Sequence, residues 1–454
     1  MVSFYVPRKK SFDRSAFELE CASLDIKGQG VGKARGCVWF CEDLLPGEVA
    51  RVQPVWQKGT TGQCSIIKLL KRSERRMEDP CPVRGQCGGC PLAHINPDDA
   101  LDAKVAGIRR IFKKAGIELS APSFIERSPQ QGYRRSCRLA ARFDRGVFRL
   151  GFRAGKSKDV CTIDSCLTLC PELNNLLPEL RELLGSLRCR GKIGHVELVQ
   201  GDEAAGINLR VTAAIPKEDE EALAAFAKAR RIVVSATENV MERTSEGMKE
   251  LPRSRLICGD PDSLYITSDG IRILCRGDSF VQVNREVNKA MVGRVLKAVD
   301  PKPGMSVLDL FCGIGNFTLP LAKSGAKVVG ADVVDSMTEL ATRSAKLAGI
   351  STASFVTVDL DEAFEKDDFA LGDHDAVVMD PGREGASRAC AYCAKRSFPL
   401  VVLVSCNPLA AARDLPQMLS SGYSIKEWGI FDMFPRTAHI ETVIVLTRAK
   451  GKKA

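Results

Sequence analysis

A cysteine followed by Asn-Pro stands directly after an apolar stretch near the C-terminus. Val401–Val404 predicts a buried strand, and Ser405, Cys406, Asn407 and Pro408 follow it. The residue before a proline is pushed out of the helical region, so the chain must turn at Asn407. Cys406 is then presented at a strand tip, where we expect nearby helix N–H groups to lower its pKa. A cysteine so placed can act as a nucleophile, whereas most cysteines of this half are better explained as small buried hydrophobes.

A glycine-rich turn predicts a cofactor site. Val307–Phe311 predicts a strand, Gly313 and Gly315 let the backbone approach a ligand, and a helical pattern follows. Asp332 ends the next predicted strand, 19 residues beyond Gly313, where it can accept hydrogen bonds from ribose hydroxyls. A nicotinamide-dependent dehydrogenase is disfavoured, because its fingerprint has a third glycine where this chain has Thr318. S-adenosylmethionine, which has no pyrophosphate, fits better.

Three cysteines lie close together in the N-terminal half. Cys81, Cys87 and Cys90 lie within ten residues, separated in part by glycines that allow tight turns. This spacing suits zinc or an iron–sulfur cluster, and a fourth ligand must come from elsewhere. The candidates for it are Cys161, Cys166, Cys170 and His94.

The elements that position these groups fall into three predicted parts. Residues 10–72 contain five short alternating strands, which is typical of a small OB-type β-barrel. Residues 75–270 mix helices and strands in an α+β pattern, with one helix from Asn96 to Lys114. Residues 271–454 alternate apolar strands with helices, the pattern of a doubly wound, Rossmann-like parallel sheet. The fold class is therefore α/β, with two smaller domains preceding the sheet.

Ligands of such sheets bind beyond the carboxyl ends of the strands. That rule gathers Asp309, Asp332, Asp380 and Cys406 around one crevice. The last two strands, predicted at 423–432 and 440–448, have a short connection and predict an antiparallel hairpin at one edge of the sheet.

Composition places the chain among soluble proteins with a polyanionic partner. It has 454 residues, a formal charge of +10 and 44% hydrophobic residues, with no membrane-length apolar run and no export signal in the first twelve residues. We therefore expect a cytoplasmic protein without a membrane partner, whose 18 cysteines are core residues, metal ligands or nucleophiles. Basic runs at 68–76, 134–142 and 149–158 favour RNA or DNA over a merely solvated face.

Taken together, the motifs resemble those of the RNA uracil-5-methyltransferases, and most of all the branch that acts on 23S ribosomal RNA. The resemblance rests on Cys81 to Cys90, the FVQVN segment at 280–284, LDLFCGIGNFTLPLA at 308–322, Met379-Asp380-Pro381, VSCNP around Cys406, and DMFP at 432–435 followed by His439-Ile440-Glu441. It implies an N-terminal TRAM barrel, a central domain that carries an iron–sulfur cluster and binds RNA, and a C-terminal methyltransferase domain. We also expect a monomer.

The resemblance also implies roles. Cys406 is the nucleophile that adds to uracil carbon 6, and Glu441 is the base that removes the carbon 5 proton. Strand alternation places His439 and Glu441 on one face and does not choose between them. The implied cofactor contacts are Gln282, Phe311, Gly313, Asn316, Asp332, Asp359 and Asp380. Phe280 and Asp380 are implied to touch the target base.

The same resemblance selects [4Fe-4S] over zinc and makes Cys166 the fourth ligand, beside Cys81, Cys87 and Cys90. One departure from the family pattern is the loop Gly382-Arg383-Glu384-Gly385, whose shape we expect to differ. Two alternatives compete with the methyltransferase: the dehydrogenase named above, and an RNA-binding iron–sulfur module that has lost catalysis. The second is disfavoured because Cys406 and Glu441 are both present.

Overall fold

The computed structural model describes residues 12–155, 157–244, 247–365 and 372–448. Most of the N-terminal segment in which we found no export signal lies outside these residues. Contacts divide the chain into two units: unit 1 contains residues 1–80, 90–110 and 435–438, and unit 2 contains residues 81–89, 111–434 and 439–454. Each unit is described by itself.

Unit 1 contains a six-stranded, mainly antiparallel sheet in the order β1-β5-β6-β4-β3-β2. Its strands are β1 (Phe17–Glu20), β2 (Ser23–Leu24), β3 (Gly30–Ala34), β4 (Cys37–Cys41), β5 (Val49–Lys58) and β6 (Thr61–Lys71). The sequence predicted five strands here, and the difference is the two-residue β2. Alternation along these strands buries one face, with Trp39 at 1% exposure and Leu19 and Cys41 at 0%. Helix α1 (Pro97–Lys114) begins in unit 1, where Asn96 caps it, as predicted.

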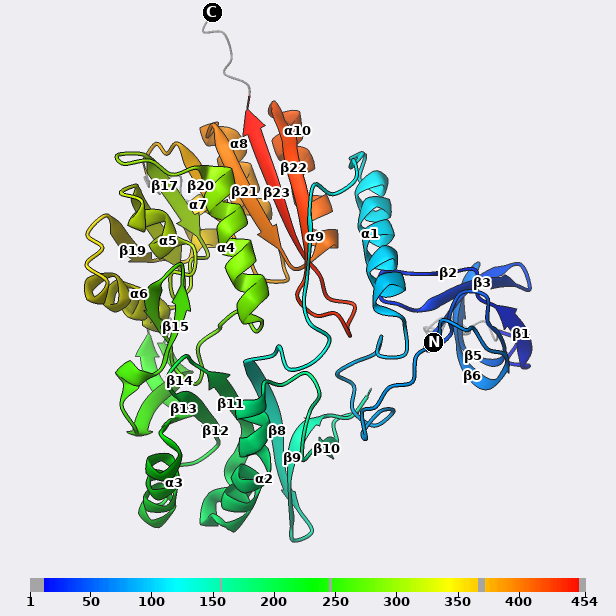
Figure 1. The fold of residues 1–454 in the computed structure, drawn as a ribbon, viewed down its shortest axis with the longest axis horizontal. Helices are drawn as coiled ribbons and strands as arrows, with labels where there is room; N and C mark the ends of the chain where they lie inside the picture. Colours follow the sequence, from blue (N-terminus) through cyan, green and yellow to red (C-terminus); the bar gives the residue numbers. More distant parts are fainter. Residues whose placement is uncertain (1–11, 156, 245–246, 366–371, 449–454) are drawn as a thin grey trace, which may run out of the picture. The chain divides into compact units, whose positions relative to one another are not determined.

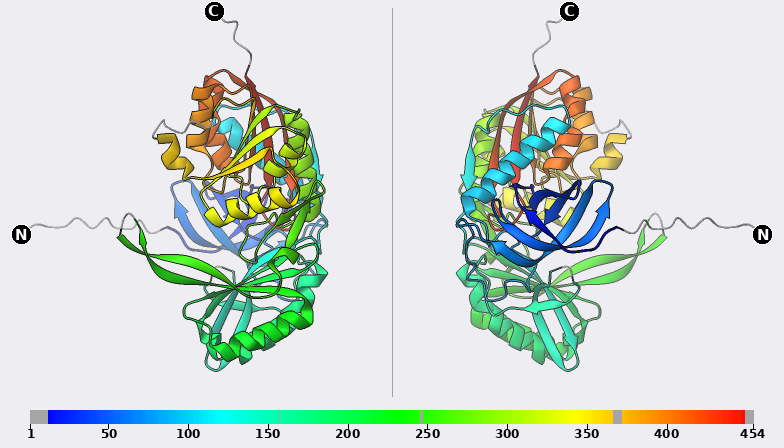
Figure 2. Two further views of the ribbon diagram at one scale, coloured as in Figure 1. Left: turned by 90° about the vertical axis from the view of Figure 1, so that its left-hand side faces the viewer. Right: turned by 90° about the vertical axis from the view of Figure 1, so that its right-hand side faces the viewer.

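The middle of the chain forms a seven-stranded sheet in the order β10-β9-β8-β11-β12-β13-β14. The strands are β8 (Ser136–Asp144), β9 (Val147–Arg153), β10 (Val160–Thr162), β11 (Ile193–Gln200), β12 (Ala205–Val211), β13 (Ile232–Thr244) and β14 (Gly247–Cys258). One face packs on α2 (Pro171–Ser186) and α3 (Lys217–Arg230) through a core of leucines and valines. Figure 2 shows the β13–β14 hairpin extending beyond the rest of this sheet.

An eight-stranded sheet in unit 2 has the order β19-β18-β17-β20-β21-β23-β22-β7. Its strands are β17 (Ser306–Leu310), β18 (Lys327–Asp332), β19 (Ala353–Thr357), β20 (Ala376–Met379), β21 (Leu400–Ser405), β22 (Tyr423–Asp432), β23 (Glu441–Arg448) and β7 (Ile125–Arg127). The five strands β17 to β21 are parallel, which confirms the predicted parallel sheet, although β19 was not among the predicted strands. Strand β23 is antiparallel to β21.

Helices cover this sheet on both faces. They are α4 (Arg285–Val299), α5 (Thr318–Lys323), α6 (Asp335–Leu347), α7 (Leu360–Glu365), α8 (Ser387–Arg396), α9 (Pro408–Asp414) and α10 (Pro416–Ser420). Figure 1 shows α4 in front of the sheet and α8 and α10 behind it. Strands β15 (Tyr265–Ser268) and β16 (Ile271–Leu274) form a separate hairpin that packs against α6. Short 3-10 turns lie at Arg188–Lys192 and Pro261–Ser263.

The prediction that the last hairpin forms an edge of the sheet was wrong. Residues Ile125–Arg127 pair in parallel with Ile430–Asp432 of β22, so β7 is the edge strand. Phe124, just before β7, contacts Phe431 edge to face with ring centroids 5.3 Å apart. Strand β7 has only three residues and no alternating pattern of its own, so the sequence contains no signal for this pairing.

Candidate functional site

Strand register brings the predicted residues to one end of the eight-stranded sheet. Ser405 pairs with Thr442 in the antiparallel ladder of β21 and β23, so the next residue, Cys406, stands opposite Glu441. Thr442 Oγ1 donates to the Ser405 carbonyl at 3.1 Å and fixes this end of the ladder. Asp380 follows β20, the other neighbour of β21. Three residues far apart in sequence therefore meet because adjacent strands end together.

The turn that presents Cys406 is held by its own polar side chains. The backbone N–H of Asn407 donates to Ser405 Oγ at 3.2 Å. The side-chain Oδ1 of Asn407 accepts the backbone N–H of Leu409 at 3.1 Å and so caps α9. Asn407 Nδ2 donates to the Arg383 carbonyl at 2.8 Å and so ties this turn to the loop after β20. Cys406 is half-buried, as expected for a group at a strand tip rather than in the core.

The structure separates Glu441 from His439. Glu441 is the first residue of β23 and is 6% exposed, whereas His439 precedes the strand and is exposed. The expectation that both share one strand face was wrong, because alternation applies only within the strand. Burial raises the pKa of the Glu441 carboxyl well above its ordinary value, with a further rise from Asp380 and an opposing effect of Arg383. Glu441 is therefore the buried carboxyl group beside Cys406.

The expected lowering of the Cys406 pKa is wrong for the protein without ligands. Burial raises the pKa of the Cys406 thiol to about 11, and the carboxylates of Glu441 and Asp380 add to the rise. The charge of Arg383 acts in the opposite direction. Loss of hydration and two neighbouring anions thus outweigh the short helix α9.

Arg383 was not predicted as a site residue, and it is the cation that counters these acids. It follows Asp380-Pro381 in the loop whose shape we expected to differ. Gly385 closes the loop with φ +88°, and an added Cβ there would collide with the carboxylate of Asp414. That carboxylate accepts the Ala386 N–H at 2.8 Å. A cation three residues after an acidic strand end was the available signal for Arg383.

Asp380 is held by Gln282, another predicted cofactor contact. Gln282 Nε2 donates to Asp380 Oδ2 at 3.2 Å. Burial raises the pKa of Asp380 to about 7, and the hydrogen bond from Gln282 opposes that rise. The Gln282 segment is itself fixed by Arg135, whose Nε donates to the Gln282 carbonyl at 3.0 Å. Phe280, in the same segment, is 72% exposed, which leaves its ring available to a ligand.

The glycine turn after β17 adopts conformations that suit close backbone approach. Phe311, Gly313 and Gly315 all have positive φ, at 63°, 53° and 88°. Asp332 Oδ2 accepts the Gly313 N–H at 2.9 Å, and Oδ1 accepts the Val334 N–H at the same distance. Carboxylate oxygens accept more than one hydrogen bond each, so Asp332 retains capacity for ribose hydroxyls.

Three further predicted or neighbouring groups complete this end of the sheet. Asn316 exchanges two side-chain amide hydrogen bonds with Asn288 of α4, at 2.9 and 3.0 Å. Asp359 is exposed, and its Oδ1 accepts the N–H of Asp361 at the start of α7. Burial raises the pKa of Asp309 to about 7, although Thr318 donates a hydrogen bond to it. Asp309 is fully buried, so it lies beneath the site and does not line it.

The four cysteines predicted to bind a metal are divided between the two units. Cys81, Cys87 and Cys166 are half-buried in unit 2, and Cys90 is half-buried in unit 1. Burial raises the pKa of Cys87, with smaller effects of Cys161, Cys166 and Cys81, so these thiols lie near one another. The residues that the structure describes nevertheless contain no group of three or more His, Cys, Asp or Glu arranged to hold a metal ion.

Comparison with known proteins identifies the family. The sequence profile described as "tRNA (Uracil-5-)-methyltransferase" matches residues 98–449. The chain belongs to the RNA uracil-5-methyltransferase family. It is therefore an S-adenosylmethionine-dependent RNA uracil-C5 methyltransferase, as the motifs implied.

Full-length relatives agree with this assignment. The 23S rRNA (uracil(1939)-C(5))-methyltransferase RlmD of Tolumonas auensis is 35% identical over 453 residues, which covers 99% of this chain and 100% of the relative. The RlmD of Vibrio parahaemolyticus is 34% identical, with 99% and 100% coverage.

A solved structure shares the fold. The tRNA (uracil-54, C5)-methyltransferase of Pyrococcus abyssi, in complex with S-adenosyl-L-homocysteine, has a TM-score of 0.69 at 23% identity, covering 95% of this chain and 100% of its own. Within the described part of the chain, no helix is both long and apolar enough to cross a membrane.

Proposed function

We propose that this protein forms 5-methyluridine in 23S ribosomal RNA through a covalent adduct between Cys406 and uracil carbon 6. The observation that supports the proposal is the strand register, in which Cys406 stands opposite the buried Glu441 and Asp380 follows the neighbouring strand β20. The RNA substrate is inferred from relatives that match over their full length and are named for 23S rRNA.

The chemistry assigns one task to each group. Uracil carbon 5 is a poor nucleophile, so the Cys406 thiolate adds to carbon 6 and moves the electron pair toward carbon 5. Bound S-adenosylmethionine supplies the electrophilic methyl group. Glu441 then takes the proton from carbon 5, the double bond reforms, and the cysteine leaves as a thiolate. The base must reach the same uracil ring as Cys406. The pairing of β21 with β23, in which Glu441 stands opposite Cys406, supports this role for Glu441.

The cofactor contacts are proposed on the same geometry. Asp332 and the Gly313 turn suit the ribose end of S-adenosylmethionine, since both belong to the carboxyl end of β17 and β18. The proposed set is Gln282, Phe311, Gly313, Asn316, Asp332, Asp359 and Asp380. Phe280 suits stacking on the target uracil, which must leave its own stack to reach Cys406.

The central sheet offers a cationic surface for the RNA. Along β8 and β9 the residues Arg138, Arg142 and Arg149 alternate with the buried core, so they lie on the face opposite α2 and α3. Burial holds the pKa of His195 below its ordinary value, and nearby Arg138, Arg153 and Arg210 lower it further. A face with this density of guanidinium groups gains affinity for a phosphate backbone by releasing counterions.

Trapping the adduct tests the function. Wild-type protein with labelled S-adenosylmethionine should methylate 23S rRNA and form a denaturant-resistant complex with RNA that contains 5-fluorouridine, because fluorine cannot leave as a proton. Cys406→Ala should abolish both signals, and Glu441→Gln should retain adduct formation with ordinary uridine while product release fails. His439→Gln is the matched control and should behave as wild type. A wild-type protein that methylates no ribosomal RNA contradicts the proposal.

We also propose that Cys81, Cys87, Cys90 and Cys166 hold a [4Fe-4S] cluster. The effect of Cys81 and Cys166 on the pKa of Cys87 supports a shared site, and thiolates are the usual ligands of such clusters. Anaerobically purified protein should be brown and contain iron and sulfide, and Cys166→Ser should lower its visible absorption. A colourless protein that contains zinc would contradict the assignment.

The remaining organisation is proposed with it. Residues 10–72 form a TRAM-type RNA-binding barrel, residues 75–270 carry the cluster and the cationic face, and residues 271–454 form the methyltransferase domain. The six-stranded sheet of unit 1 supports the first assignment. Deletion of residues 10–72 should weaken binding to 23S rRNA and leave S-adenosylmethionine binding unchanged. A ribosomal substrate also makes the cytoplasm the proposed place of action.

A further inference from the structure

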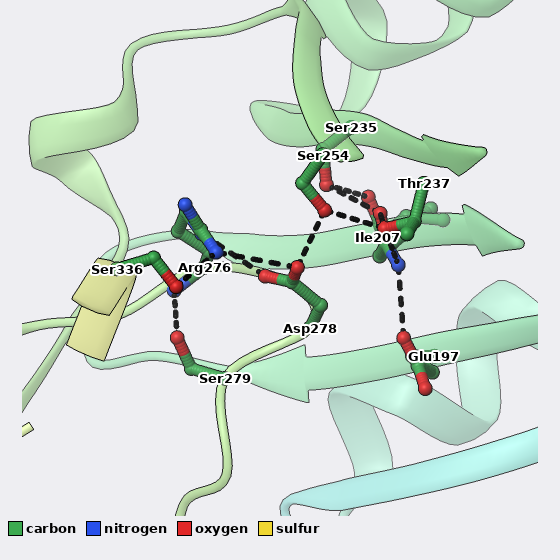
Figure 3. A network of polar contacts seen from close by, with 10 residues as sticks. Glu197, Ile207, Ser235, Thr237, Ser254, Arg276, Asp278, Ser279 and Ser336 are labelled. Atoms are coloured by element: carbon green, nitrogen blue, oxygen red, sulfur yellow. Dashed lines mark hydrogen bonds and ion pairs between the residues drawn. The ribbon is translucent and has the colours of Figure 1, made fainter. Parts of the chain in front are cut away.

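A chain of polar side chains runs between the cationic face of the central sheet and the first turn of α6. Its members are Glu197, Asn208, Thr237, Ser254, Asp278, Arg276 and Ser336, and Figure 3 shows most of them with their contacts. They come from β11, β12, β13, β14, the segment after β16, and α6. We call this set the polar bridge.

The central part of the polar bridge is buried and fully ordered by its hydrogen bonds. Asn208 is 0% exposed, and its Nδ2 donates to Glu197 Oε2 at 2.8 Å and to Thr237 Oγ1 at 2.9 Å. Thr237 and Ser254 share a hydrogen bond through their hydroxyls, and Ser254 donates to Asp278. A serine hydroxyl has one proton, so Thr237 must be the donor to Ser254. The Thr237 proton is then not available to Asn208 Oδ1, which lies 3.1 Å from Thr237 Oγ1 and accepts the Ser235 hydroxyl at 3.0 Å instead. The hydrogen bonds that lead from Asn208 Nδ2 through Thr237 and Ser254 to Asp278 therefore all point the same way.

Each end of the polar bridge is an ion pair. At one end, Glu197 Oε1 lies 3.0 Å from Arg210 Nε and 3.6 Å from Arg138 Nε, on the face proposed for RNA. At the other end, Arg276 Nε donates to Asp278 Oδ1 at 3.0 Å.

Arg276 also reaches the cofactor side of the sheet. Its Nη2 donates to Ser336 Oγ at 3.0 Å. Ser336 belongs to the first turn of α6, four residues after Asp332. Asp332 in turn fixes Val334 and Gly313 by hydrogen bonds. The bridge thus ends on the segment that holds the proposed ribose carboxylate.

We propose that the polar bridge couples RNA binding to S-adenosylmethionine binding, with Arg276 as a positioning residue. The inference rests on the proposed function, because it needs RNA phosphates at Arg138 and Arg210. Phosphates compete with Glu197 for these guanidinium groups, and Glu197 then depends more on Asn208. The one-directional hydrogen bonds transmit that change to Asp278 and Arg276, which stiffens the turn at Ser336. The cofactor then binds a segment that is already ordered, so its affinity rises.

Calorimetric titration of the intact protein tests the coupling. S-adenosylhomocysteine is titrated into the protein alone and with saturating unmodified 23S rRNA transcript, and the ratio of the two Kd values is the readout. We expect RNA to tighten binding about five- to tenfold in the wild type, at the lower end of ordinary coupling. Ser336→Ala should bring the ratio near one, and Ser336→Thr, which keeps the hydroxyl, should restore it.

Two more variants make the test specific. Thr342→Ala removes a hydroxyl of the same helix that donates to the Thr338 carbonyl, so its ratio should equal the wild-type ratio. Thr237→Val cuts the polar bridge in its middle and should act like Ser336→Ala, provided that its far-ultraviolet dichroism shows a folded protein.

The possible results separate the inference from the function. A wild-type protein that methylates 23S rRNA but shows a ratio near one overturns the inference alone. A ratio that survives Ser336→Ala, or that Thr342→Ala also abolishes, overturns it as well. A protein that makes no 5-methyluridine while RNA still tightens S-adenosylhomocysteine binding contradicts the proposed function and supports the coupling.

Discussion

The raised pKa of Cys406 predicts an unreactive thiol in the protein without ligands. With a pKa of about 11, only about one thiol in ten thousand is ionised at pH 7, against about three in a hundred for free cysteine of pKa about 8.5. The ionised fraction of Cys406 is therefore about 300-fold smaller than that of free cysteine. A more basic thiolate is more nucleophilic. With a Brønsted slope of about 0.45, a pKa about 2.5 higher makes the Cys406 thiolate about 13-fold more reactive and offsets part of this deficit. Cys406 should therefore react with a small disulfide about 20-fold more slowly than free cysteine.

The assay is the rate of mixed-disulfide formation at Cys406, followed by mass spectrometry of its peptide from pH 7 to 10. The logarithm of the rate should rise by about one for each pH unit across this whole range, since the pKa lies above it. Asp380→Asn removes one of the two anions and should lower the apparent pKa, whereas Arg383→Gln removes the opposing cation and should raise it. A wild-type profile that levels off below pH 9, or a shift of the wrong sign in either variant, would refute the electrostatic reasoning.

Three other outcomes follow from the site. Burial raises the pKa of Asp309 to about 7, so ionisation of its carboxyl opposes folding. The free energy of unfolding should therefore fall as the pH rises from about 4 through 7. In urea unfolding, Asp309→Asn should make this decrease smaller by up to about 4 kcal/mol. Gly385→Ala, at positive φ and against a buried carboxylate, should lower the unfolding free energy by about 1–3 kcal/mol and reduce kcat, whereas Gly382→Ala, in open space, should do neither. Asn288→Ala removes the amide pair behind the cofactor loop and should weaken S-adenosylhomocysteine binding about tenfold in calorimetry, with the fold intact by dichroism.

Local sequence patterns predicted most strands of the eight-stranded sheet. The strands β17 and β21 end within one residue of their predicted positions, because apolar runs and the turns after them are local properties of the chain. The rule that ligands bind beyond parallel strand ends then predicts that Asp332, Asp380 and Cys406 lie at the same end of the sheet.

Other features depended on partners that no local pattern names. Strand β7 joined the sheet through a pairing with residues about 300 positions away, and Arg135 reached the Gln282 segment across 147 residues. The polar bridge likewise draws on six separate elements. Side-chain polarity predicts that such groups need partners, but only the folded chain decides which partners they find.

By itself, the sequence determined the family and the candidates for the nucleophile and the base, because a chemical role requires a residue type and a strand end, and both are local properties of the chain. The tertiary structure decided how those groups are tuned. Glu441 became the buried group and His439 the exposed one because β23 begins at residue 441. The pKa of Cys406 rose instead of falling, because burial and the carboxylates of other strands act through space, and distance in space is fixed only by the fold.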